Sequence, residues 1–124
     1  MARLVRRFSP LLALVVASVA LSSCGTGGAV TDARSSCVLV KRALALQAQS
    51  DATGLSAARR SSLQGQAMSD LLKAAPSAAA ATSIDGSWNA LMTTINEAER
   101  VPLNNLVPSL TRLCKVADSS SPYL

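Results

Sequence analysis

Three cysteines, Cys24, Cys37 and Cys114, are the residues of this chain best suited to covalent chemistry. A cysteine thiolate can accept a lipid, attack a substrate, bind a metal or take part in a disulfide. The sequence contains no histidine, so neither a Ser-His-Asp nor a Cys-His catalytic arrangement can form. A zinc site would need further cysteine or histidine ligands. We therefore predict that the protein holds no metal and no other cofactor.

Carboxylates are the other groups that could perform acid–base catalysis. Glu97 and Glu99 are two residues apart in a segment with helical periodicity, so their side chains point in different directions. The early glycines, Gly25, Gly27 and Gly28, do not form a phosphate-binding loop of the P-loop type. We find no catalytic constellation and predict that the protein is not an enzyme.

The first part of the chain has the layout of a secretory signal peptide. Arg3, Arg6 and Arg7 precede an uncharged apolar run at residues 11–21. This run has 11 residues, whereas a membrane-spanning helix needs about 20. The segment therefore indicates export and removal, and not a permanent transmembrane anchor.

The end of the apolar run carries a more specific pattern. Leu21, Ser22, Ser23 and Cys24 place a branched apolar residue and two small residues before a cysteine, and this pattern resembles the lipobox of bacterial lipoproteins. The resemblance implies that residues 1–23 are cut away and that the Cys24 sulfur receives a diacylglycerol with acyl chains such as palmitate. Two acyl chains hold a protein stably on a membrane. The resemblance thus implies a protein exported to the cell envelope and lipid-anchored to the outer face of the bacterial cytoplasmic membrane.

An ordinary signal peptide is the alternative. Ser18, Val19 and Ala20 also offer small residues at a plausible cleavage site. Cleavage there would release a soluble protein.

The lipobox bears on the other two cysteines. If Cys24 carries lipid, Cys37 and Cys114 remain as a pair, and an exported domain lies where disulfides persist. Their disulfide would close a loop of about 78 residues and stabilise the domain by roughly 4.5 kcal/mol. Two buried free thiols are the alternative.

Charge argues against nucleic acid as a partner. Of 12 basic residues in the whole chain, Arg3, Arg6 and Arg7 precede Cys24, which leaves nine basic and seven acidic side chains in the remainder. No basic stripe with interleaved aromatic residues is present, and such a stripe is typical of nucleic-acid binding.

Apolar residues at spacings of three and four predict helices throughout the part after Cys24. We expect helices at residues 32–51, 56–75, 84–100 and, starting at Leu103 or Asn105, up to Ala117. Asp32 and Ser56 are candidate caps, Gly54 is a stop, and Pro76 is expected to end the second helix. Residues 77–83 are expected to form a loop or one loose turn.

These elements predict an all-α fold, an up-and-down four-helix bundle at residues 32–118. A flexible tether at residues 24–31 and a frayed tail at residues 119–124 flank it. In such a bundle, the start of the first helix and the end of the last meet only when the helix number is even, so a Cys37–Cys114 disulfide favours four helices. Arg34, Lys73, Trp88, Arg112 and Lys115 would then lie toward the membrane-proximal end. Asp51, Arg59, Arg60, Glu99, Arg100 and Asn104 would lie toward the distal end.

Two functions are compatible with these features. The first is a non-enzymatic interaction or structural module that presents its distal end to another envelope protein. The second is a carrier that binds an apolar, lipid-like ligand between its helices. Candidate contact residues are Trp88, which is otherwise a core side chain, and Arg59 and Arg60, which are otherwise a solvated pair.

Overall fold

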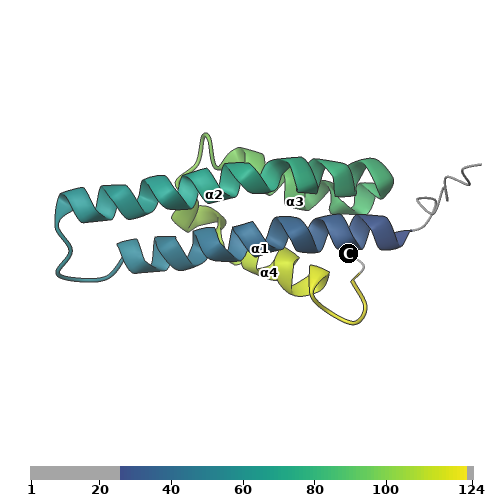
Figure 1. Cartoon of the computed structure of the whole chain (residues 1–124), viewed down its shortest axis with the longest axis horizontal. Coiled ribbons are helices and arrows are strands. Elements are labelled where there is room, and N and C mark those ends of the chain that lie inside the picture. The colour runs from purple at the N-terminus through teal and green to yellow at the C-terminus, as the bar shows by residue number, and fades with distance from the viewer. Residues whose placement is uncertain (1–25, 123–124) are drawn as a thin grey trace, which may run out of the picture.

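The computed structural model describes residues 26–122, so the predicted signal peptide and Cys24 lie outside the described residues. Within that range the chain forms helices α1 (Thr26–Ser50), α2 (Ala57–Ile84), the short 3₁₀ helix η1 (Gly86–Trp88), α3 (Asn89–Glu97) and α4 (Leu103–Ala117). Figure 1 shows α1 and α2 as a long antiparallel hairpin, with α3 beside α2 and α4 beside α1. The predicted all-α bundle of four helices is confirmed.

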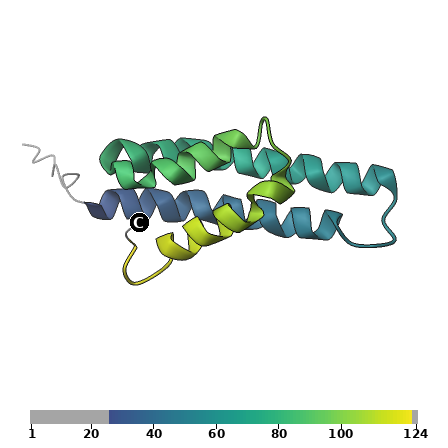
Figure 2. The same cartoon turned by 180° about the vertical axis from the view of Figure 1, so that it is seen from behind.

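The hairpin is longer than the helices that cover it. α1 has 25 residues and α2 has 28, whereas α3 has nine and α4 has 15. Seen from behind in Figure 2, α3 and α4 lie along the part of the hairpin near the start of α1, and the part next to the α1–α2 turn projects beyond them. The turn between α1 and α2 therefore forms a free end of the molecule, which we call the hairpin end (residues 51–56).

A seam of small buried side chains joins α1 to α2. Its positions in α1 alternate in spacing between four and three: Ala29, Ala33, Ser36, Val40, Ala43, Gln47 and Ser50. Its positions in α2 follow a similar spacing: Leu63, Ala67, Leu71, Ala74, Ala78 and Ala81. This alternation is the heptad pattern of a coiled coil. Because most of these side chains are small, the two helices can pack closely along the seam.

The start of α1 differs from the sequence prediction. Residues 26–31 were expected in a flexible tether, but they form the first turns of α1, and Asp32 lies inside the helix and not at its cap. Ala29 is fully buried and Val30 is 8% exposed. Burial of this apolar surface stabilises helix in a segment whose glycines disfavour it. The predicted tether is therefore wrong from Thr26 onward.

The second helix also continues past its predicted end. Pro76 lies inside α2, and residues 77–83 are helical and not a loop. A proline within a helix removes one backbone hydrogen bond and costs about 3 kcal/mol. Ala78 and Ala81 beyond it are fully buried in the seam, and the buried Ser36 hydroxyl donates to the Ala74 carbonyl at 3.0 Å. Packing against α1 thus outweighs the local cost of Pro76.

At the hairpin end, the structure agrees with the helix cap and the glycine stop predicted from the sequence. Ser56 caps α2, and its hydroxyl accepts a hydrogen bond from the Arg59 backbone N–H at 3.1 Å. Gly54 has a φ of +80°, a conformation that glycine adopts without the strain other residues incur. Both predictions are confirmed.

The helix predicted at residues 84–100 is divided and shorter. Asp85 caps η1 through its carboxylate, α3 begins at Asn89, and α3 ends at Glu97. α4 begins at Leu103, the earlier of its two predicted starts, and Pro108 lies inside this helix.

Candidate functional site

The disulfide joins α1 to α4 in the middle of the structure. Cys37 and Cys114 are bonded, with their Cα atoms 5.4 Å apart and a sequence separation of 77. Both are buried, at 0% and 2% exposure. The predicted pair is confirmed. Because α1 begins at Thr26, Cys37 lies near the middle of that helix and not at its start.

Basic side chains of α1 bind the end of α4 around this disulfide. Arg34, one turn before Cys37, donates to the Ala117 carbonyl at 2.7 Å and to the Ser119 carbonyl at 3.1 Å. Lys41, one turn after Cys37, lies 2.6 Å from the Asp118 carboxylate. A cation at the end of a helix interacts favourably with its unpaired carbonyls and its dipole. These contacts therefore hold the last turn of α4 against α1.

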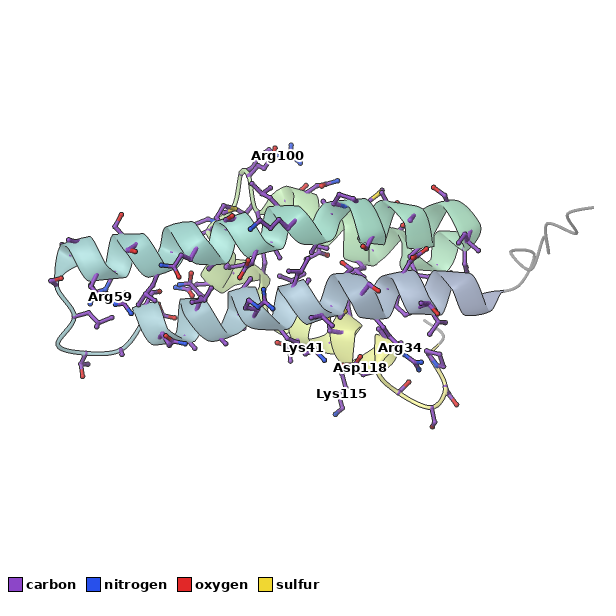
Figure 3. The ribbon with its side chains drawn as sticks, in the orientation of Figure 1. Arg34, Lys41, Arg59, Arg100, Lys115 and Asp118 are labelled. Carbon is purple, nitrogen blue, oxygen red and sulfur yellow. A yellow bond between two sulfur atoms is a disulfide. The ribbon has the colours of Figure 1, made fainter. Side chains whose placement is uncertain are left out.

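These two partnerships were missed from the sequence. The signal that could have found them is the disulfide itself. Once Cys37 and Cys114 are paired, residues one turn to either side of Cys37 must lie beside the last turns of α4. Figure 3 shows Arg34, Lys41, Lys115 and Asp118 together along the edge where α4 runs beside α1.

An open groove follows the α1–α4 contact. The residues that line it are Lys41, Leu44, Thr111, Cys114, Lys115 and Asp118. Its volume is about 280 Å³. Lys115 lines the groove, and Arg42 and Arg112, which are sequence neighbours of the lining residues Lys41 and Thr111, are exposed. The side chains of Arg42, Arg112 and Lys115 make no hydrogen bond or ion pair with the part of the chain that the structure describes.

The predicted arginine pair at the hairpin end divides into two roles. The Arg60 guanidinium donates to the Ser50 carbonyl at 3.1 Å. It therefore supplies a hydrogen-bond donor to a backbone carbonyl in the last turn of α1. The Arg59 guanidinium is exposed (Figure 3) and has no hydrogen-bonding or charged partner within residues 26–122. Arg60 therefore has a structural role, and a partner contact at Arg59 stays a prediction.

A second hollow lies between the hairpin and the start of α4. Amide side chains line much of it, from Gln47, Gln64 and Asn104, and its volume is about 230 Å³. Asp51 accepts hydrogen bonds from Gln47 at 3.1 Å and from Asn104 at 3.5 Å. The Gln47 and Asn104 amides thus share the Asp51 carboxylate as their acceptor. The hollow is open to solvent.

Trp88 belongs to the core. Its side chain is fully buried, with 0% exposure, within the apolar core, where η1 packs against α2 and α3. Contact with a partner, ligand or lipid headgroup would require an exposed surface, so the contact prediction for Trp88 is wrong and its alternative, a core side chain, applies.

The predicted distribution of charge between the two ends needs correction. The Ala74 carbonyl accepts a hydrogen bond from Ser36 in the middle of α1, so Lys73, the residue before Ala74, lies at the same level of the bundle. Lys115 lines the same groove as Lys41. Neither is near the start of α1. The end of the bundle that contains the start of α1, the end of α2 and η1, which we call the proximal end (residues 28–33 and 83–90), has Asp32 and Asp85 as its charged residues.

Asp85 is the titratable group whose environment is altered most clearly. Its carboxylate accepts a hydrogen bond from the Ser87 backbone N–H at 2.9 Å. This hydrogen bond lowers the pKa of Asp85 below its ordinary value of 3.8 because it stabilises the ionised form. The carboxylate therefore serves as a cap, and its lowered pKa is the opposite of the shift that a general acid needs at neutral pH.

Residues 26–122 lack two further features, a cluster of metal ligands and a membrane-spanning helix. In that range no three or more histidine, cysteine, aspartate or glutamate side chains gather as a metal site. None of the helices there combines the length and apolar character that crossing a bilayer would demand. Comparison of the chain with known protein families, with curated proteins and with solved structures finds no match.

Proposed function

We propose that the protein is an exported bacterial lipoprotein, anchored to the outer face of the cytoplasmic membrane through a diacylglyceryl group on Cys24. Its helical domain is a non-enzymatic interaction or structural module of the cell envelope. The hairpin end is the surface offered to a neighbouring envelope protein.

One observation supports the anchor above the others. The Cys37–Cys114 disulfide uses two of the three cysteines and leaves Cys24 for another role. Cys24 is also the cysteine that the lipobox resemblance selects. A disulfide fits an exported domain, because thiols are kept reduced inside the cell.

The start of α1 favours an anchor that holds the domain close to the membrane. α1 begins at Thr26, two residues after Cys24, and two residues span at most about 7 Å. With 25 residues at 1.5 Å each, α1 is about 37 Å long. The hairpin end therefore lies far from the anchor, at the distance where a neighbouring protein can reach it.

A carrier of apolar ligands has less support. Pockets for small molecules have volumes of about 300–1,000 Å³ and bury most of the ligand. The two hollows described above measure about 280 and 230 Å³ and are open to solvent. The seam between α1 and α2 is closed by its own side chains.

The anchor is tested by replacing Cys24 with serine in the full-length chain. We expect the Cys24→Ser variant to lose incorporation of radiolabelled palmitate and to leave the membrane fraction. Ser22→Ala is the matched control, because it changes a neighbouring residue but keeps a small side chain and the cysteine. Unchanged labelling of the Cys24→Ser variant would overturn the proposal.

The interaction surface is tested by a photo-crosslinking amino acid placed at Arg59, on the hairpin end, and at Lys73, on the middle of α2. Both side chains are exposed. We expect one defined envelope protein to be captured in intact cells from Arg59 and not from Lys73. Equal capture from both positions would contradict a specific role of the hairpin end.

A further inference from the structure

We propose that the domain lies on its side, with the exposed face of α1 and α4 against anionic phospholipid headgroups. This face, the basic face, consists of Arg34, Val38, Lys41 and Arg42 of α1 and Arg112 and Lys115 of α4. The proposal rests on the lipid anchor at Cys24 and adds the orientation of the domain and the surface that contacts the membrane.

Contacts within the structure place Arg34, Lys41 and Lys115 on one side, and helical spacing places Arg42, four residues after Val38, and Arg112 on the same side. Arg34 and Lys41 both bind residues at the end of α4, and Lys41 and Lys115 line the same groove. Arg112 lies one turn before Lys115, and on a helix residues three apart are neighbours. Val38 lies between Arg34 and Lys41 at spacings of four and three, and 56% of it is exposed.

The charge of this face differs from that of the remaining surface. The basic face contains five cations, and Asp118 beside Lys41 is the anion next to it. The other described residues contain four cations and six anions: Arg59, Arg60, Lys73 and Arg100 against Asp32, Asp51, Asp70, Asp85, Glu97 and Glu99. One side is thus clearly positive, and the rest of the described surface is negative overall.

The positive charge is available to an external anion. Arg34 bonds backbone carbonyls, which bear no net charge, so its own charge is not cancelled. Arg42, Arg112 and Lys115 have no anionic partner within residues 26–122. Basic residues near an anionic bilayer are attracted over about one Debye length, roughly 8 Å at physiological ionic strength.

An upright orientation would bring the wrong charge to the membrane. In that orientation the proximal end would face the lipid, and it contains Asp32 and Asp85 but no lysine or arginine among its described residues. The hydrogen bond from the Ser87 backbone N–H to the Asp85 carboxylate favours its ionised form. Anionic headgroups would repel this end and attract the basic face. The short segment between Cys24 and Thr26 keeps the face within reach of the headgroups.

An exposed valine within a ring of cations suits this contact. Val38 can enter the boundary between headgroups and acyl chains while the surrounding lysine and arginine side chains reach the phosphates. The same charges could attract an acidic protein. The experiment below uses bilayers without any other protein, so an effect seen there comes from the lipid.

The test measures helix orientation in supported bilayers by polarised infrared spectroscopy of the processed, lipid-modified protein. The charge-reversal variant is Arg112→Glu/Lys115→Glu. Its matched control is Arg59→Glu/Lys73→Glu, which changes the net charge by the same amount on exposed positions of α2. Circular dichroism checks that both variants fold as the unmodified protein does.

In bilayers that contain phosphatidylglycerol, we expect the axes of α1 and α2 to lie near the membrane plane. This in-plane order should be lost in pure phosphatidylcholine, at about 1 M salt where the Debye length falls to about 3 Å, and in the charge-reversal variant, but not in the control. Helices near the membrane normal, or equal behaviour of the two variants, would overturn the orientation. Failure of the protein to remain in any bilayer would instead overturn the anchor on which the orientation depends.

Discussion

The disulfide offers the clearest quantitative prediction. Replacing both cysteines, in Cys37→Ala/Cys114→Ala, removes a link between residues separated by 77 positions. Because this link closes most of the domain into a loop, its main effect is to restrict the unfolded chain. In the loop-entropy treatment its removal should lower the free energy of unfolding by about 4.5 kcal/mol.

That loss is large for a domain of this size. Small domains have unfolding free energies of about 5–15 kcal/mol, and each kcal/mol shifts the melting temperature by about 4–8 °C. The melting temperature should therefore fall by about 18–36 °C. The lost sulfur atoms leave space in the core, so the double variant reports both the cross-link and the packing.

The two contributions are separated by comparing oxidised and reduced forms of the unmodified protein, which contain the same buried atoms. Urea unfolding followed by circular dichroism gives the free energies, and peptide mapping under non-reducing conditions verifies the link. Cys24→Ser is the matched control and should leave the midpoint unchanged, since Cys24 precedes the bundle. A difference below about 1 kcal/mol between oxidised and reduced protein would refute the assignment of a major stabilising role to this disulfide.

Two further predictions concern backbone conformation and pH. Gly54→Ala should destabilise the protein by about 1 kcal/mol in urea unfolding, because the φ of +80° at Gly54 strains other residues; Gly65→Ala should stabilise it by up to about 1 kcal/mol, because Gly65 lies inside α2 with open space around it. Equal effects of the two changes would contradict this reasoning. The lowered pKa of Asp85 means that its contribution to stability is complete above its ordinary pKa of 3.8 and is lost as the pH falls through the lower folded-state value. Asp85→Asn should reduce the acid dependence of the urea midpoint below about pH 4, and an unchanged dependence would exclude the cap as its source.

Local features of the fold were predictable where a single residue decides the backbone. Gly54 supplies a positive φ, Ser56 caps α2, and the spacing of apolar residues gives helices. The four helices also followed from that spacing. The parity argument from the Cys37–Cys114 pair does not support the number of helices, because Cys37 lies near the middle of α1 and not at its start. The features that were predicted depend on short stretches of sequence.

Other features depend on packing between distant segments. Pro76 is a strong local signal for a helix end, yet Ala78 and Ala81 beyond it pack against the start of α1. The spacing of apolar residues within α2 cannot show how much of the surface of α2 is covered by α1. The same mutual packing makes Ala29 and Val30 part of α1 and not of a tether.

The candidate site was predicted only in part. The disulfide was found from the cysteine count, but the basic side chains near it were assigned to the wrong part of the bundle. That assignment depended on Cys37 being near the start of a helix. Because α1 begins eleven residues earlier, at Thr26, Arg34 and Lys41 lie along the side of the domain and bind α4.

The central claim is that Cys24 carries the membrane anchor, and the mass of the processed N-terminus tests it most directly. Protein extracted from membranes should be digested and its first peptide analysed by mass spectrometry. The account predicts that this peptide begins at Cys24 and carries the mass of a diacylglyceryl group. A first peptide that begins after Ala20, or an unmodified Cys24, would contradict it.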